Sequence, residues 1–83
     1  PSSRQRFLAR AIVASTRRIV DQALQEAWDD IPRTQLERRA LLSDLEQRSQ
    51  DCARAASCVA ALRSALLESD RTVDHLRRRH ATH

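Results

Sequence analysis

Three histidines near the end of the chain have types and spacing that could bind a metal ion: His75, His80 and His83. His80 and His83 lie three residues apart, a spacing that places two ligands on one face of a helix. No cysteine or other firm ligand is spaced to complete a coordination set. Surface histidines at a helix end are therefore the preferred interpretation, and we expect no metal and no other cofactor.

The two cysteines, Cys52 and Cys58, could provide a nucleophile or a disulfide. Six residues apart on one helix, they point about 120° away from each other, so a straight helix cannot join them. Nothing in the sequence gives Cys52 a general base or an orienting acid. We therefore expect Cys52 to be a small buried residue, and the sequence holds no signal for an enzyme.

The composition excludes several classes of functional site. The 83 residues include no glycine and two prolines. Glycine-rich phosphate loops, nucleophile elbows and dinucleotide fingerprints all need a residue that tolerates close backbone approach or positive φ, so they are excluded. Alanine, leucine, arginine, glutamine and glutamate are abundant, which favours helix throughout. No apolar stretch is long enough to span a membrane and no hydrophobic signal region is found, so we expect a cytoplasmic protein of a bacterium.

The charges are arranged in three blocks. All 15 basic residues are arginines, and residues 1–18 carry five of them with no acid. Residues 19–76 contain all eleven acids, and Arg77, Arg78 and Arg79 follow. Such a layout can indicate an acidic partner or a nucleic acid. Because no nucleic-acid-binding motif accompanies it, binding of DNA or RNA is a less favoured alternative.

Apolar residues recur at helical spacing in the first third of the chain and predict a helix over about residues 3–30. One stripe is formed by Leu8, Ile12, Ile19 and Ala23. A neighbouring stripe is formed by Val13, Val20, Leu24, Ala27 and Ile31. Ser2 or Ser3 is the expected N-cap. Pro32 disfavours helical conformation at the residue before it, so a break is expected near residues 29–32.

Two further segments are predicted to be helical. Thr34 and Glu37 form a T-x-x-E capping box, which predicts a second helix over about residues 33–49. A third helix is predicted over about residues 52–68, with a short fourth helix over about 71–80 as an option, and a single helix over 33–80 is the alternative. The third segment carries a heptad seam formed by Cys52, Ala55, Val59, Leu62, Leu66, Ser69, Val73, Leu76 and His80.

These elements predict one all-α domain over residues 1–83. It is an antiparallel three- to four-helix bundle, or a helical hairpin with a long coiled-coil-like C-terminal helix. So short a chain has a thin core. We therefore expect either a homodimer or a groove that accepts a helix of a partner.

Trp28 is the only tryptophan in a chain with one other aromatic residue, Phe7. It lies beside the predicted break after the first helix. One interpretation is a core anchor that fixes the corner between the first two helices. The other is a partly exposed anchor for a ligand helix, because tryptophan is enriched at binding hot spots.

The sequence around Trp28 resembles the FliT family of flagellar export chaperones. The resemblance begins with the segment Glu26-Ala27-Trp28-Asp29-Asp30-Ile31 and continues with Arg38-Arg39-Ala40-Leu41-Leu42. That family shows a long first helix, a W-D-x-[LI] element and an R-x-x-L-L helix at about this distance. The run from Leu62 to Leu66, followed by Asp70-Arg71-Thr72-Val73 and Leu76, is similar to the junction of the family's third and fourth helices.

The resemblance implies a non-enzymatic, cytoplasmic chaperone of flagellar type III export. Its client is the filament-cap protein, and its further partners are export gate or export ATPase components and a flagellar transcriptional regulator. An amphipathic client helix lies in an apolar groove between the second and third helices. Val73 and Leu76 cover that groove as a lid hinged near Ser69 and Asp70. The expected groove floor is formed by Leu41, Leu42, Leu45, Val59, Leu62 and Leu66.

A second hypothesis needs no client. The heptad seam over residues 52–80 would pair with a second copy, which makes the chain a helical-hairpin homo-oligomerisation or adaptor module.

Overall fold

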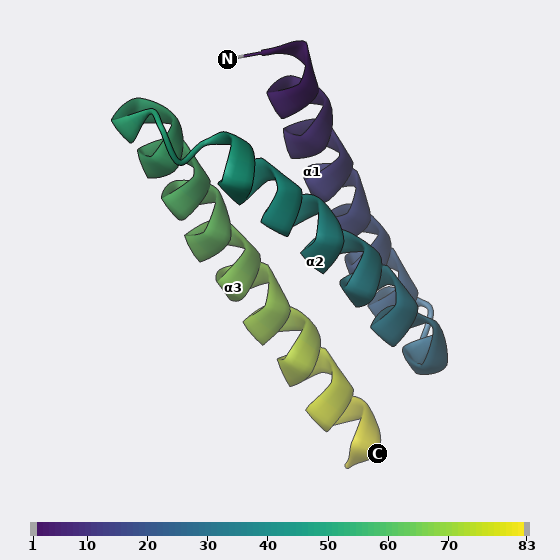
Figure 1. Ribbon diagram of the computed structural model, residues 1–83. Helices are drawn as coiled ribbons and strands as arrows, with labels where there is room; N and C mark the ends of the chain where they lie inside the picture. The colour runs from purple at the N-terminus through teal and green to yellow at the C-terminus, as the bar shows by residue number, and fades with distance from the viewer. Residues whose placement is uncertain (1, 83) are drawn as a thin grey trace.

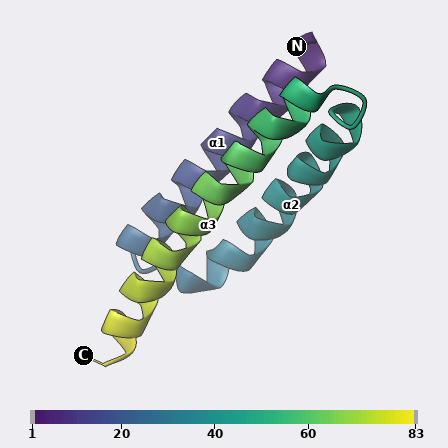
Figure 2. The ribbon, with the colours of Figure 1, turned by 90° about the vertical axis from the view of Figure 1, so that its left-hand side faces the viewer.

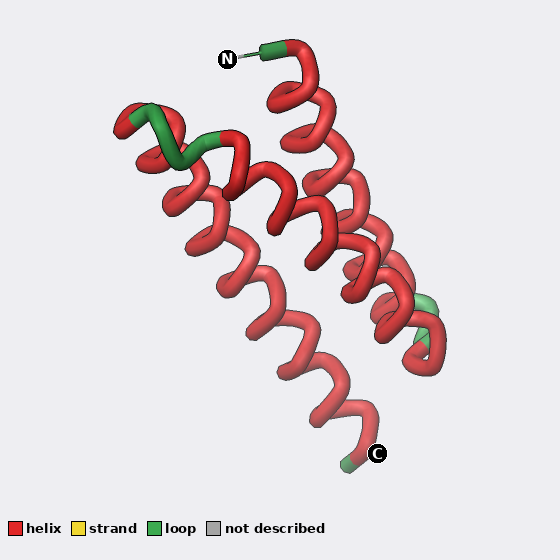
Figure 3. Tube along the Cα trace, in the orientation of Figure 1, coloured by secondary structure: helices red, strands yellow, loops and turns green. Residues whose placement is uncertain are grey.

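The computed structural model describes residues 2–82, which form three long helices and one short helix. α1 spans Ser3–Leu24, the 3-10 helix η1 spans Trp28–Asp30, α2 spans Ile31–Arg48 and α3 spans Ala53–Ala81. In the view of Figure 1 the chain runs down, up and down again as a bundle 48 Å long, and α1 begins at the opposite end of that bundle from the end of α3. Loops are confined to short connections between the helices (Figure 3). The predicted all-α class is confirmed.

α1 begins with a complete capping box. The Ser2 hydroxyl accepts a hydrogen bond from the Gln5 backbone N–H at 3.1 Å. In return, the Gln5 side-chain oxygen accepts one from the Ser2 backbone N–H at 2.8 Å. This reciprocal pair satisfies two backbone donors that a helix start leaves free.

α1 ends at Leu24, about six residues before the predicted end. Glu26 adopts a left-handed conformation with φ 60°. The Ala27 N–H then bonds the Gln22 carbonyl at 2.8 Å, and the Glu26 N–H bonds the Ala23 carbonyl at 3.1 Å. This is a Schellman motif, which terminates a helix and normally has glycine at the left-handed position. Without any glycine in the chain, the sequence carries no clear signal for it.

The break between the first two long helices lies at residues 25–30, just before α2 begins at Ile31, and Pro32 does not interrupt α2. It lies in the first turn of α2, where a missing N–H removes no hydrogen bond. The predicted capping box of Thr34 and Glu37 is wrong, because Thr34 lies inside α2 and is only 3% exposed. Its hydroxyl donates to the Gln22 side-chain oxygen at 3.1 Å and thereby joins α2 to α1.

The turn between α2 and α3 occupies residues 49–52 and is held by a contact from α1. The Gln5 side-chain amide donates to the Arg48 carbonyl at 3.1 Å, which satisfies one of the free carbonyls at the end of α2. Ser49 is buried and donates its hydroxyl to the Leu45 carbonyl at 2.8 Å. α3 then runs without a break from Ala53 to Ala81, so neither a separate fourth helix nor a single helix over 33–80 forms.

The core consists of two apolar clusters separated by a polar layer. The first cluster is formed by Leu8, Ile12, Leu45, Val59 and Leu66. The second cluster is formed by Ile19, Ala23, Ile31 and Val73. Between them in the sequence of α1 and α2 lie the buried polar residues Ser15, Thr34 and Arg38. Both clusters draw on all three helices, so each helix is fixed at two levels.

None of the helices within residues 2–82 has the length together with the apolar character that crossing a bilayer requires.

Candidate functional site

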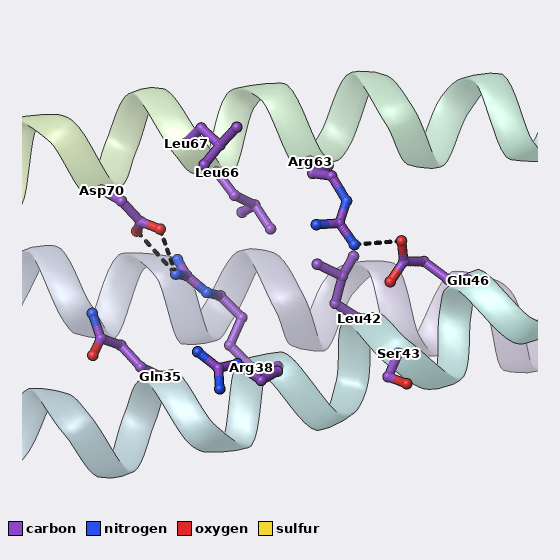
Figure 4. A pocket seen from close by; sticks show the side chains of 10 residues that line it. Gln35, Arg38, Leu42, Ser43, Glu46, Arg63, Leu66, Leu67 and Asp70 are labelled. Carbon is purple, nitrogen blue, oxygen red and sulfur yellow. Dashed lines mark hydrogen bonds and ion pairs between the residues drawn. The ribbon is translucent and has the colours of Figure 1, made fainter.

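A hollow of the described surface lies between α2 and α3. α3 packs more closely against α1 than against α2, and the ribbons of α2 and α3 diverge away from the turn that joins them (Figures 1 and 2). A cleft of about 520 Å³ occupies this space, and the ribbon of α1 passes behind it (Figure 4). The cleft, called the α2–α3 groove below, is lined by Gln35, Arg38, Arg39, Leu42, Ser43, Glu46, Arg63, Leu66, Leu67 and Asp70.

Arg38 spans the inner end of the groove. Arg38 is only 8% exposed, and one of its terminal guanidinium nitrogens donates to both carboxylate oxygens of Asp70 at 2.9 Å. The other terminal nitrogen donates to the Thr16 hydroxyl at 3.3 Å. One guanidinium thus connects α1, α2 and α3. Such charge-assisted bonds are stronger than neutral ones and hold the group in one orientation.

A second ion pair crosses the groove nearer the α2–α3 turn. Arg63 of α3 donates to the carboxylate of Glu46 of α2, and both side chains are substantially exposed. Figure 4 shows this pair and the Arg38–Asp70 pair as two bridges between the same two helices. Between them, the groove presents apolar side chains, including Leu67, which is 53% exposed.

This arrangement suits a polypeptide helix better than a small polar molecule. The groove offers a short apolar surface from Leu42, Leu66 and Leu67, with charged groups at both of its ends. A client helix could insert apolar side chains from one face and pair polar side chains with the rim.

The six predicted floor residues take different places from those expected. Leu45, Val59 and Leu66 are buried together with Leu8 and Ile12 of α1. Their partners Leu41, Leu42 and Leu62 are partly buried against the same cluster. Of the six, only Leu42 and Leu66 line the α2–α3 groove. The others form the interior of the bundle because α1 covers the surface that was expected to be open.

The predicted lid is not found. α3 continues through Ser69 and Asp70, so no hinge interrupts it. Val73 is buried and packs against Ile19, Ala23 and Ile31, with Leu76 partly buried beside them. These two residues therefore belong to the core and do not cover the groove.

Trp28 lies in η1, at the corner between α1 and α2. It is half-buried, and it packs against the second apolar cluster. Its ring centroid lies 5.5 Å from that of His80, near the end of α3. The indole Nε1 is buried without a hydrogen-bond partner among the described residues. Trp28 is therefore placed at the corner, away from the α2–α3 groove.

The other residues considered for chemistry lie apart from one another. Cys52 is the N-cap of α3 and is exposed, so the expected buried position is wrong; Cys58 is exposed too. His80 lies 3.2 Å from a carboxylate oxygen of Glu26, and His83 lies outside the described residues. Within residues 2–82, no group of three or more candidate ligands is placed to hold a metal ion.

Sequence reasoning missed the charged residues of the groove, above all Arg38 and Asp70. A signal for Arg38 was available, because it shares the inward spacing of Ile31, Thr34 and Leu45 on α2. An arginine on the buried face of a short helix needs a partner, since an unpaired buried charge is costly. The identity of that partner depended on the position of α3, which no local pattern gives.

A comparison of the chain with protein-family models, with curated proteins and with solved structures finds no significant match.

Proposed function

We propose that this protein is a non-enzymatic binding protein that takes an amphipathic helix of a client in the α2–α3 groove. The observation that carries the proposal is the separation of α2 from α3, which leaves a cleft of about 520 Å³ with leucines inside it. A helix that covered Leu67 would remove apolar surface from water and so gain binding energy.

More specifically, we propose a bacterial, cytoplasmic chaperone of flagellar type III export. The support for this finer assignment is the resemblance of the Trp28 segment and of residues 38–42 to the FliT family. The proposed client is the filament-cap protein, with export gate or export ATPase components and a flagellar transcriptional regulator as further partners. The groove holds the client's helix by apolar contact, and no bond of the client is changed.

The two ion pairs across the groove determine how a client can enter it. A client that enters deeply must separate Arg63 from Glu46, which are exposed and bind each other weakly. The Arg38–Asp70 pair lies deeper and is more costly to open, because Arg38 is almost fully buried. Client binding therefore separates the Arg63–Glu46 pair before the Arg38–Asp70 pair.

The homo-oligomerisation module is less well supported. That hypothesis needs the apolar seam of residues 52–80 on the surface, where a second copy could reach it. Val59, Leu66 and Val73 of that seam are instead buried against α1 and α2.

Two exposed leucines provide a matched test of the groove. Leu67 lies at the groove and is 53% exposed, whereas Leu36 is 65% exposed and does not line it. We expect Leu67→Asp to weaken binding of a peptide from the C-terminal helix of the filament-cap protein by at least about tenfold, since burying the exposed half of Leu67 contributes roughly 1 kcal/mol and the new carboxylate would lose its water on binding. Leu36→Asp should leave the affinity unchanged. Isothermal titration calorimetry measures both, with circular dichroism to verify the fold.

The outcomes separate the two levels of the proposal. Binding of this peptide to the wild-type chain with equal loss in both variants would place the client elsewhere on the surface. No binding of the peptide to the wild-type chain would remove the flagellar assignment.

A further inference from the structure

The exposed side of α1 carries a second regular pattern, distinct from the stripe that α1 buries. Six residues follow one another in steps of four and three, which is the spacing of a coiled-coil seam. They lie on a line rotated by roughly 140° from the buried stripe of Leu8, Ile12 and Ile19. This line, called the α1 outer seam below, is formed by Arg6, Arg10, Val13, Arg17, Val20 and Leu24. Val20 is partly buried and the other five residues are exposed.

The three arginines of the α1 outer seam are free to meet a partner. Arg6, Arg10 and Arg17 form no ion pair within the described chain. Arg4 and Arg18, by contrast, reach Asp44 and Glu37 of α2, each at 3.4 Å. α1 has five arginines and one acid, Asp21, so its outer surface carries a strong local excess of positive charge.

This charge does not serve the stability of α1. The N-terminal end of a helix is the positive end of its dipole, where acidic side chains are favourable and basic ones are not. The first turn of α1 contains no acidic residue, and Arg4 and Arg6 lie at or next to it. The unpaired arginines also repel one another along the seam. An acidic partner would reverse both costs.

The apolar residues on the same line indicate what kind of acidic partner fits. Val13 is 39% exposed and Leu24 is 65% exposed, and both lie on the line of the arginines. Phosphates of a nucleic acid would pair with arginine but would leave these side chains against polar groups. A helix that carries both carboxylates and leucines at heptad spacing would satisfy both residue types over roughly 27 Å, the length of 18 residues of helix.

We propose that the α1 outer seam docks an acidic amphipathic helix of a partner protein, as a second interface separate from the α2–α3 groove. The carboxylates of the partner helix face Arg6 and Arg10 at the start of α1, and its apolar residues face Val20 and Leu24 at the end. Because no residue of the seam lines the groove, a client in the groove and a helix on the seam can be bound at the same time.

The test uses a synthetic probe of about three heptads with leucine at positions a and d and glutamate at e and g, which disfavours pairing of the probe with itself. Calorimetry measures its affinity for the full chain at about 50 mM and about 500 mM salt, because contacts between exposed charges are screened by salt. The triple variant Arg6→Gln/Arg10→Gln/Arg17→Gln should lose at least about tenfold in affinity at low salt, since exposed ion pairs each contribute a factor of a few.

A matched triple variant provides the control. Arg33→Gln/Arg54→Gln/Arg77→Gln removes the same net charge from exposed positions outside the seam and should lose less than about threefold. Leu67→Asp should leave probe affinity unchanged, because the groove is not involved. Equal losses in the two triple variants, or loss in Leu67→Asp alone, would overturn the proposal. So would tighter binding of a duplex DNA or of anionic vesicles than of the probe, or no binding of the probe to the folded wild-type chain.

Discussion

α2 packs against α1 along most of its length, whereas it meets α3 at only a few positions. On the α1 side, Thr34 and Arg38 form hydrogen bonds to Gln22 and Thr16. On the α3 side, two ion pairs bridge a cleft of about 520 Å³. The same helix therefore has one face that holds the bundle together and one that remains available. A surface that binds a partner is expected where internal packing is sparse, since local opening costs least there.

The largest loss of stability is expected for substitutions in the core that α1 forms with its neighbours, and a much smaller one for substitutions at the groove. Ile12 is fully buried, so Ile12→Ala should lower the free energy of unfolding by roughly 2–4 kcal/mol through lost burial and the cavity left behind. Leu67→Ala at the groove should change it by less than about 1 kcal/mol. Urea denaturation followed by circular dichroism measures both. Similar losses at the two sites would show that the groove is packed as tightly as the core.

Breaking the Arg38–Asp70 pair, at the boundary between core and groove, should cause an intermediate loss of stability. Asp70→Asn leaves the buried guanidinium facing a neutral group and should lower the free energy of unfolding by roughly 1–3 kcal/mol. The partial exposure of Asp70 places the effect below that of a fully buried pair.

A double variant separates charge from packing at this position. Replacing both partners, as Arg38→Met/Asp70→Leu, should restore most of the stability lost in Asp70→Asn, because no buried charge is left unpaired. A double variant as unstable as the single one would mean that Arg38 contributes chiefly through its bonds to α1.

The smallest change in stability is expected for the exposed ion pairs of Asp44, at the surface between α1 and α2. The hydrogen bond from Arg48 to Asp44, at 2.8 Å, lowers the pKa of that carboxyl, and Arg4 contributes from 3.4 Å. A pKa that is lower in the folded chain stabilises the fold above the unfolded-state value of about 3.8, and this stabilisation is lost as pH falls through the folded-state value. Asp44→Asn should therefore lower Tm slightly at neutral pH and not at strongly acidic pH.

Thermal unfolding at both pH values measures this difference. Asp51→Asn is the control, because Asp51 is exposed and forms no ion pair within residues 2–82. A difference in Tm for Asp44→Asn that persisted at strongly acidic pH would rule out the ion pairs as its cause.

Periodicity identified the buried stripe of α1 but did not distinguish it from the neighbouring stripe, of which Val13 and Leu24 are exposed. Leu8, Ile12, Ile19 and Ala23 form the buried stripe of α1 that their spacing indicates. The ends of helices depended on long-range contacts or unusual backbone geometry. Glu26 takes a left-handed conformation usually filled by glycine, and the Gln5 side chain caps a helix that ends 43 residues later in the sequence.

The candidate site was predictable to a lesser degree. A groove between the second and third helices was expected, and Leu42 and Leu66 do line a cleft there. The apolar floor was assigned to residues that α1 covers, because a sequence pattern identifies an apolar face without showing which neighbour meets it. Arg38 and Asp70 lie 32 residues apart and come together only in the folded bundle.

The corner between α1 and α2 has a consequence for spectroscopy. Trp28 is the only tryptophan and the chain contains no tyrosine, so its near-ultraviolet absorption and emission come almost entirely from one indole. That indole contacts the core and lies 5.5 Å from the imidazole of His80 in the last turns of α3. Emission from the unmodified chain therefore reports directly on whether the end of α3 is seated against the corner. Movement of this helix end can be followed by tryptophan fluorescence without an added dye.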